Sequence, residues 1–399
     1  MLNPFQVNVS DKTLEYIRTR VKEYPWNHIE MPDDGGWLYG TNMDYLKEFC
    51  DYWVNEYDWR KWEVKINKFS HFKAPVDGID IHFIMEKGSG PSPTPLLINH
   101  GWPGSVVEFL DIIEPLAHPE RFGGKEEDAF DVIAPSLPGF GFSGRPSRPM
   151  GPRKMAEIFN KLMTETLGYE NYLAQGGDWG SVVSNWLGYD HAPSCMAIHV
   201  NCAGMRHVDG PQTPEEIVWQ EKLDRDQIME DGYRTQQATK PQTLGYSMAD
   251  SPVGQAAWIL EKFQTWSDTE GDDIESAHSK DTLLTNIMVY IVTNTFNTAS
   301  WVYFGRREEG EGLMGPDGKR GLEGCGRVLG ANGRKVEVPT ACALFPAEML
   351  PWPPRSYCER MYNITRWTEM DHGGHFAALE DPTFLVDDIR AFARTLRSS

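Results

Sequence analysis

A short segment near the middle of the chain surrounds one acidic residue with small ones. Gln175-Gly-Gly-Asp-Trp-Gly-Ser181 directly follows an apolar run, Tyr172-Leu-Ala-Gln175. Glycines on both sides of Asp178 permit a tight turn, because no Cβ obstructs the backbone. A strand, such a turn and a helix hold the side chain at the tip above the sheet edge, where backbone N–H groups face it. The segment therefore predicts a buried strand that ends in a sharp turn with Asp178 at its tip.

Strand and helix patterns alternate around this turn. Short apolar runs at residues 96–99 and 131–134 have the composition of buried parallel strands, whereas residues 106–116 and 154–166 have helical spacing. Alternation of this kind implies a mostly parallel central sheet with helices on both faces. We therefore expect an α/β fold.

Pattern and composition divide the chain into five segments. The first carries a helix capped by Ser10, a second helical pattern and a strand after an Asp-Gly turn at Asp77. A later helical segment, with one helix expected to begin at Ser251-Pro252, interrupts the α/β pattern, and such an insertion is usually a cap over the active site. We expect an N-terminal extension at residues 1–88, the first part of the core at 89–206 and a helical cap at 207–304. A glycine-rich excursion loop at 305–334 and the second part of the core at 335–399 are expected to follow.

Charge restricts the partners that a chain of 399 residues can bind. It has 38 Lys and Arg against 58 Asp and Glu, a formal net charge of −20. Such a field repels phosphate backbones and anionic lipid, so nucleic acid is excluded as an expected partner. No apolar run approaches the roughly 18–20 residues that a membrane-spanning helix needs. We expect a small neutral ligand, and leave open whether the chain forms a homodimer.

Cysteine usage and the N-terminus indicate a compartment. The six cysteines include no close C-x-x-C pair, which disfavours zinc clusters and redox motifs, although an even count leaves disulfides open. Met1-Leu-Asn-Pro-Phe-Gln-Val lacks the basic flank and apolar stretch of a signal peptide. We therefore expect a cytoplasmic protein.

The residue at the tip of the predicted turn determines the chemistry. A carboxylate needs no base to become a nucleophile, and it attacks saturated carbon to leave an ester. The other interpretation of Asp178 is an ordinary helix-capping residue in a plain turn. Taken alone, the segment does not distinguish the two.

Three further segments supply the groups that such a nucleophile needs. His100-Gly-Trp-Pro-Gly-Ser105 follows a strand, and its loop can offer the Trp102 N–H as an oxyanion donor beside the Trp179 N–H. His375 lies in a loop before the last helix, and Glu348 ends a late strand, where it can orient that histidine. Each feature alone is common in structural roles, but the order nucleophile, acid, histidine matches that of α/β-hydrolases.

These motifs resemble those of epoxide hydrolases of the microsomal type. The resemblance covers nearly the whole chain and weakens in the cap and the glycine-rich loop. It implies an α/β-hydrolase fold with a helical cap and an N-terminal epoxide-hydrolase-type domain, and it implies no metal or organic cofactor. The segments that carry it are Tyr57-Asp-Trp-Arg60, Asp77-Gly-Ile-Asp-Ile-His-Phe83, His100-Gly-Trp-Pro-Gly-Ser105, Pro135-Ser-Leu-Pro-Gly-Phe-Gly-Phe-Ser143, Gly176-Gly-Asp-Trp-Gly-Ser181 and Gly373-Gly-His-Phe-Ala-Ala-Leu-Glu380.

The resemblance also implies two cap tyrosines that bind the epoxide oxygen and donate a proton. Matched by motif, they are Tyr233, in Asp231-Gly-Tyr-Arg, and Tyr303, in Ser300-Trp-Val-Tyr-Phe-Gly305. The residues after Tyr303 depart from the basic and acidic ones usual in the family. Among 15 tyrosines, Tyr246 and Tyr290 remain competitors.

The implied reaction converts an epoxide to a vicinal diol, in detoxification or in biosynthesis. Asp178 would form a covalent alkyl-enzyme ester, and water activated by the His375–Glu348 pair would hydrolyse it. Alternatives are an epoxide-opening cyclase at the same site and a haloalkane dehalogenase, which shares the aspartate and a neighbouring tryptophan. A serine esterase built on Gly245-Tyr-Ser-Met-Ala249 is disfavoured because no buried strand precedes that segment. A non-catalytic binder would have no use for an acid–histidine pair.

Overall fold

One sheet of nine strands forms the centre of the molecule. The computed structural model describes residues 2–30, 36–310, 328–329 and 333–397. Strand pairs from β1 to β5 are antiparallel and those from β5 to β11 are parallel, which agrees with the predicted mostly parallel sheet. In sheet order the strands are β1 (Asn3–Phe5), β2 (His71–Val76), β3 (Ile79–Glu86), β5 (Phe130–Pro135), β4 (Thr94–Asn99), β6 (Tyr172–Gly176), β7 (Cys195–Val200), β10 (Val336–Leu344) and β11 (Tyr362–Glu369).

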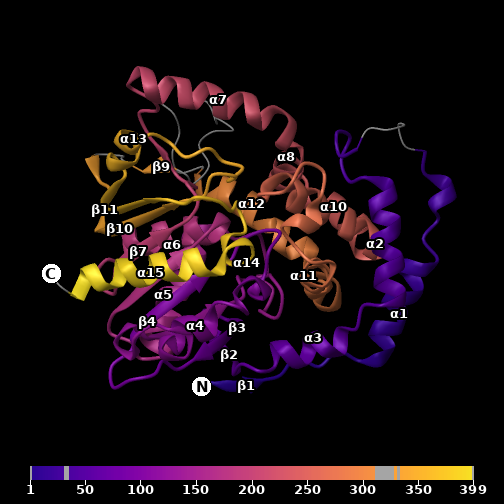
Figure 1. Ribbon diagram of the computed structural model, residues 1–399, viewed down its shortest axis with the longest axis horizontal. Helices are drawn as coiled ribbons and strands as arrows, with labels where there is room; N and C mark the ends of the chain where they lie inside the picture. Colours follow the sequence, from indigo (N-terminus) through magenta and orange to yellow (C-terminus); the bar gives the residue numbers. More distant parts are fainter. Residues whose placement is uncertain (1, 31–35, 311–327, 330–332, 398–399) are drawn as a thin grey trace.

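Helices flank this sheet. Helix α15 (Pro382–Arg397) crosses in front of the strands in Figure 1 and packs with α4 (Ile113–Ala117), whereas α5 (Pro152–Lys161) and α6 (Asp178–Asp190) pack against each other. The central strands β4, β5 and β6 are buried along nearly their whole length, so side chains cover both of their faces. The architecture is therefore the expected α/β one.

Six helices form the segment predicted to be a cap. They are α7 (Pro214–Glu230), α8 (Gly232–Thr239), α9 (Pro241–Asp250), α10 (Pro252–Trp266), α11 (Lys280–Thr293) and α12 (Phe296–Gly310). Ser251 caps α10 by accepting a hydrogen bond from the Gly254 N–H at 2.9 Å, as the sequence predicted.

The N-terminal helices lie beside these six helices. Helices α1 (Asp11–Lys22), α2 (Met43–Asn55) and α3 (Trp59–Ile66) form the right-hand side of the molecule in Figure 1, where α1 and α2 flank α10 and α11. The Tyr52 hydroxyl donates to Asp281 on α11 at 2.8 Å, and the hydroxyls of Tyr57 and Thr285 lie 2.9 Å apart. The N-terminal segment therefore contacts α11 as well as extending the sheet.

Two predicted elements differ in the structure. The helix expected over residues 106–116 is split into a 3-10 turn, η2 (Val106–Phe109), and α4, because Pro115 lacks the amide hydrogen that a continuous helix needs. The predicted excursion loop begins inside a helix, since α12 continues to Gly310. Gly305 lies within this helix and does not end it. A Cβ at Gly305 would overlap the backbone of Met150, so the glycine allows α12 to pack closely against Met150. Residues 311–327 and 330–332 of that loop lie outside the described residues.

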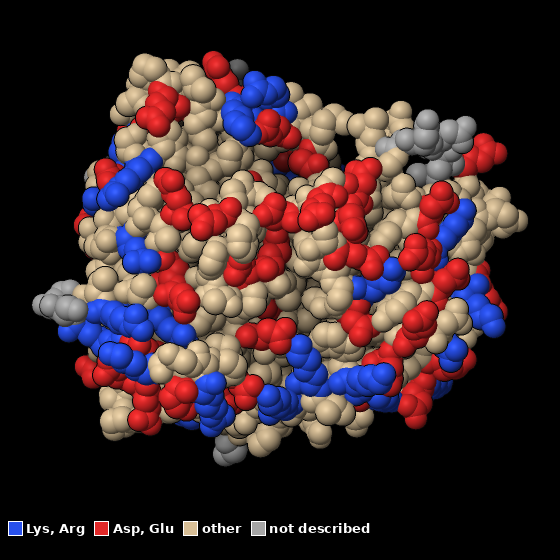
Figure 2. All heavy atoms as spheres, in the orientation of Figure 1, with Lys and Arg blue, Asp and Glu red and all other residues tan. Residues whose placement is uncertain are grey.

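Acidic side chains are widespread on the visible face of the molecule (Figure 2). In Figure 2 carboxylates spread across the middle and right of the visible face, and Lys and Arg gather along its lower edge.

Cys325 lies outside the described residues, and the five other cysteines are buried free thiols. Within the described ranges, no helix has the length and apolar character required to cross a membrane.

Candidate active site

The sharp turn predicted at Asp178 is present between β6 and α6. Asp178 has a φ of 45°, a left-handed conformation that side chains other than glycine rarely adopt. A Cβ on Gly176 would overlap the Gly180 carbonyl, and one on Gly180 would overlap the Asn99 carbonyl oxygen. The flanking glycines are therefore required by close backbone contacts, and the turn holds Asp178 in a conformation that its surroundings must enforce.

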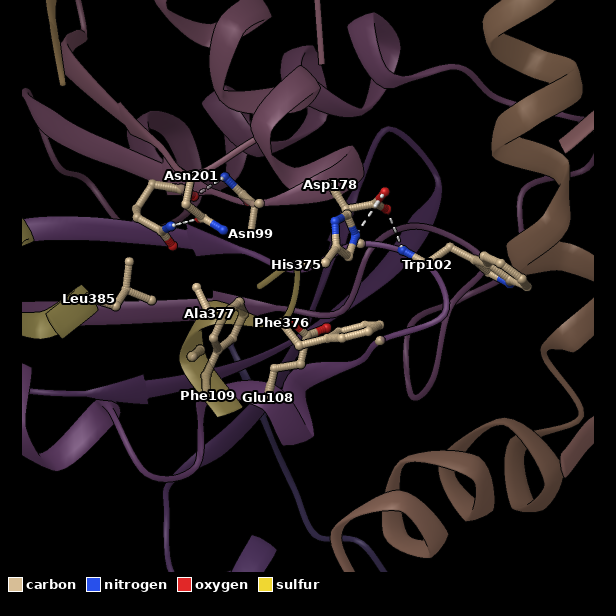
Figure 3. A pocket seen from close by; sticks show the side chains of 15 residues that line it. Asn99, Trp102, Glu108, Phe109, Asp178, Asn201, His375, Phe376, Ala377 and Leu385 are labelled. Atoms are coloured by element: carbon tan, nitrogen blue, oxygen red, sulfur yellow. Dashed lines mark hydrogen bonds and ion pairs between the residues drawn. The ribbon is translucent and has the colours of Figure 1, made fainter. Parts of the chain in front are cut away.

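The Asp178 carboxylate lies between a backbone donor and a histidine (Figure 3). The Trp102 N–H donates a hydrogen bond to Asp178 Oδ1 at 2.7 Å, and His375 Nε2 lies 3.5 Å from Asp178 Oδ2. Gly101 makes this approach possible, because a Cβ there would overlap the carboxylate. The Trp179 N–H, the second predicted oxyanion donor, is in the first turn of α6, where amides have no helical acceptor.

His375 is held by an acid and by the last residue of α10. Its Nδ1 lies 2.8 Å from Glu348 Oε1, and both side chains are almost fully buried, with exposed fractions of 2% and 1%. Its backbone N–H donates to the Trp266 carbonyl at 2.9 Å, and the Trp266 ring meets the imidazole edge-on. Burial alone would lower the pKa of His375, but the Glu348 and Asp178 carboxylates together raise it well above its usual value.

Tyr233 on α8 and Tyr303 on α12 face the same cavity as Asp178. Their ring centroids are 5.7 Å apart; Tyr233 stacks on Trp102 at 5.1 Å, and Tyr303 meets Trp179 edge-on at 4.7 Å. Burial, followed by the neighbouring Tyr233 and Asp178, raises the pKa of Tyr303 well above its usual value, so its phenol carries a proton.

The two competing tyrosines lie elsewhere. Tyr246 is 71% exposed on α9 and hydrogen-bonds Gln242. The buried Tyr290 donates to the Gly104 carbonyl at 2.6 Å, so its hydroxyl is used in fixing the loop after β4. The described lining of the cavity beside Asp178 includes Tyr233 and Tyr303 but neither Tyr246 nor Tyr290.

The serine of the alternative esterase motif is not in a turn. Ser247 is exposed in the middle of α9, within Pro241–Asp250, with no strand before it. A nucleophile needs a sharp turn that presents its side chain to a pocket. The structure therefore gives no support to a serine esterase at this position.

One group of side chains near the site has the composition of a metal site. The ligand atoms of Cys202, Glu348 and His375 lie within 4.8 Å of one another. The acid and histidine are already hydrogen-bonded to each other, and burial with two nearby carboxylates raises the pKa of the Cys202 thiol well above its usual value. Because a thiolate is the form that binds metal, we assign no metal to these residues.

Sequence reasoning did not single out Glu108 or Trp266. Glu108 lines the pocket that contains Asp178 and His375, and Trp266 contacts His375 directly. The available signal for Glu108 was an acidic residue between apolar ones in Val106-Val-Glu-Phe-Leu-Asp-Ile-Ile113, a stretch that contains Asp111 as well. Trp266 had no such signal among 14 tryptophans.

Comparison with known proteins agrees with this geometry. A family profile described as the epoxide hydrolase N terminus matches residues 2–109, and one for the alpha/beta hydrolase fold matches residues 94–245. The chain is 36% identical to Epoxide hydrolase 1 of Sus scrofa over 98% of this chain and 88% of that protein. The crystal structure of juvenile hormone epoxide hydrolase from the silkworm Bombyx mori is 28% identical, with a TM-score of 0.85 over 100% of this chain and 95% of that one. Aspergillus niger epoxide hydrolase is also 28% identical, with a TM-score of 0.82 over 99% and 96% of the two chains. The chain therefore belongs to the epoxide hydrolases with an α/β-hydrolase fold.

Proposed function

We propose that this chain hydrolyses a small neutral epoxide to a vicinal diol through a covalent ester on Asp178. The observation that carries the proposal is the position of the Asp178 carboxylate, which lies between the Trp102 N–H and His375 and shares a cavity with two phenols. A carboxylate nucleophile, a buried base and two proton donors are the groups that opening of an epoxide and hydrolysis of the resulting ester require.

In the first step Asp178 attacks one carbon of the epoxide ring. The bond between that carbon and the epoxide oxygen breaks, and Tyr233 or Tyr303 donates its proton to the epoxide oxygen. Trp102 already holds Asp178 Oδ1, which leaves Oδ2 to form the new bond to carbon. The product is a hydroxyalkyl ester of Asp178 and a tyrosinate, which solvent reprotonates.

In the second step water hydrolyses this ester. Esterification removes the Asp178 charge, which is one of the two charges that raise the pKa of His375. Formation of the ester therefore favours the neutral imidazole, which can take a proton from water as it attacks the Asp178 carboxyl carbon. The Trp102 and Trp179 N–H groups hold the developing oxyanion. As the ester C–O bond breaks, the imidazolium gives its proton to the oxygen of the departing diol, and the regenerated Asp178 carboxyl group loses its proton to solvent.

The His375→Gln variant tests the two steps separately. It removes the base of the second step but leaves the nucleophile, so we expect the ester to form and persist on Asp178. The Asp178→Ala variant should form none. Intact-protein mass after a pulse of an epoxide that the unmodified enzyme turns over measures both outcomes. An unchanged mass for the His375→Gln variant would contradict the covalent mechanism.

Two phenols in the cavity favour an epoxide over a haloalkane. A halide leaves without a proton, whereas the alkoxide formed from an epoxide needs one. Assay of halide release from a chloroalkane distinguishes these substrates directly. Incorporation of labelled water into the product distinguishes hydrolysis from closure of a cyclic ether by a hydroxyl group of the substrate.

A further inference from the structure

A carboxyl group that the two steps above do not use lies beside the nucleophile and the base. Glu108 belongs to η2, and its side chain folds back over Gly104, where a Cβ would overlap Glu108 Oε1. A backbone hydrogen bond from Ser105 reaches the carboxyl group, and no side chain of the described residues donates to it. In Figure 3 the side chain points up toward His375.

The cavity between these groups has room for one small molecule. Asp178, His375 and Glu108 all line it, with Trp102, Gly104 and Phe376 around them. Its volume is about 20 Å³, and a single water needs about 10–15 Å³. The walls offer several polar groups, and a buried water usually makes two to four hydrogen bonds.

We propose that Glu108 positions the water that attacks the Asp178 ester, an inference that rests on the proposed function. A water whose proton goes to His375 Nε2 has a second hydrogen that needs an acceptor. The Glu108 carboxyl faces the same cavity and can accept it. With both hydrogens engaged, the oxygen lone pair is directed at the Asp178 carboxyl carbon, which is the orientation that attack needs.

The protonation state of Glu108 fits this role. Burial raises the pKa of Glu108 to about 8, His375 opposes the rise and Asp178 adds to it. At neutral pH the group is therefore mostly a neutral acid. Its carbonyl oxygen can accept from water without placing a second negative charge beside the oxyanion that forms on the ester.

Substitutions at Glu108 separate a positioning role from a general structural one. Glu108→Leu keeps a similar volume but removes the acceptor, and Glu108→Gln keeps a neutral carbonyl acceptor. In single-turnover experiments with mass detection, we expect the rate of ester formation in both variants to stay within about 2-fold of the unmodified enzyme. Ester hydrolysis should slow at least ~10-fold in the Leu variant, the effect of losing a hydrogen bond worth ~1.4 kcal/mol, and recover to within about 3-fold in the Gln variant.

The control is Glu114→Gln, since Glu114 is a partly exposed carboxylate nearby in sequence that pairs with Lys68, and it should change neither step. If Glu108→Leu does not fold, Glu108→Ala replaces it with the same expectation. Wild-type ester hydrolysis in a folded variant without the acceptor would overturn the role of Glu108 and leave the covalent mechanism standing. Failure of the mechanism itself would instead be seen as the absence of ester in the His375→Gln variant.

Discussion

At the scale of single residues, the backbone of Asp178 is the most constrained feature of the site. Its left-handed φ of 45° is stabilised only by the contacts around it, because an isolated aspartate favours other conformations. Gly180 is one of those contacts, since its Cα faces the Asn99 carbonyl at the end of β4. The geometry of the Asp178 turn therefore depends on a glycine that has no side chain to offer to a substrate.

Gly180→Ala should damage both stability and activity. The added Cβ would overlap the Asn99 carbonyl oxygen, so the turn must shift, and overpacking of this kind costs about 1–3 kcal/mol. We expect the free energy of unfolding, measured with urea, to fall by that amount. We also expect ester formation to be slower, because the shifted turn misplaces the Asp178 carboxylate. Gly232→Ala is the control for stability, because a Cβ there meets nothing within 4 Å. Unchanged ester formation in a stably folded Gly180→Ala variant would show that the turn tolerates the shift.

The two cavity tyrosines should act in the first step only. Tyr233→Phe and Tyr303→Phe each leave one phenol beside Asp178, so we expect each to slow ester formation by about 10²-fold, in the usual range for a positioned proton donor. The double variant should form almost no ester. Tyr246→Phe, at an exposed position on α9, should leave the rate unchanged. Rapid quenching with mass detection measures all four rates, and equal slowing by Tyr246→Phe would contradict the assignment.

Some of these residues could be found from the sequence and others could not. Asp178 stands in a segment whose glycines have a direct steric meaning, and His375 and Glu348 follow it in a defined order. Tyr233 and Tyr303 came from resemblance alone, because no spacing rule distinguishes two tyrosines among 15. Glu108 could not be found from the sequence, because its position beside Asp178 and His375 depends on a cavity formed by segments far apart in the sequence.

At the scale of secondary-structure elements, continuous apolar runs predicted the central strands. Strands β7 and β11 were not predicted, because polar residues interrupt both: β7 contains His199, and β11 contains Arg366. Those two side chains converge on Asp388 of α15. His199 Nε2 lies 3.0 Å from the carboxylate and Arg366 Nε 2.8 Å from it. The polar residues that obscured the strand pattern in the sequence are thus the ones that bind the last helix to these strands.

Asp388→Asn should loosen that attachment. Removing one member of a buried charged group typically costs about 3–5 kcal/mol, because the remaining charge is left without a partner. Chemical unfolding at pH 7 should show a loss of that order. Asp387→Asn is the matched control, since its side chain is 66% exposed and should change stability little.

The same variant has an expected pH dependence. Burial would raise the pKa of Asp388, but His199 and Arg366 hold it well below its usual value. A carboxyl group whose pKa is lower in the folded state stabilises the protein above the unfolded pKa of about 3.9, and this contribution is lost as the pH falls through the folded value. The difference between the unmodified protein and Asp388→Asn should therefore be constant from pH 7 to 5 and decrease below pH 4. A difference that grew with acidity would contradict this ion pair.

At the scale of the whole molecule, the N-terminal helices, helices α7 to α12 and the sheet share one continuous set of buried apolar residues. Ile17 and Phe49 of the N-terminal helices, Leu260 of α10 and Ile98 of the sheet all belong to it. Hydrogen bonds from Tyr52 and Tyr57 to α11 add to this contact. Tyr233 and Tyr303 stand on α8 and α12, which belong to the same set of helices as α11. We therefore expect the geometry of the site to depend on the N-terminal helices, although the described lining of its two pockets includes no residue from them.

Trp53→Ala on α2 tests this dependence. Trp53 is 5% exposed, and truncating a buried tryptophan costs about 3–5 kcal/mol. If the N-terminal helices and the catalytic region unfold together, urea should abolish helical circular dichroism and epoxide turnover at one midpoint, and the substitution should lower both equally. Val64→Ala on α3, at a position 73% exposed, is the control and should move neither. If the Trp53→Ala variant lost part of its helical signal at a lower urea concentration than its turnover, the N-terminal helices would unfold independently of the site.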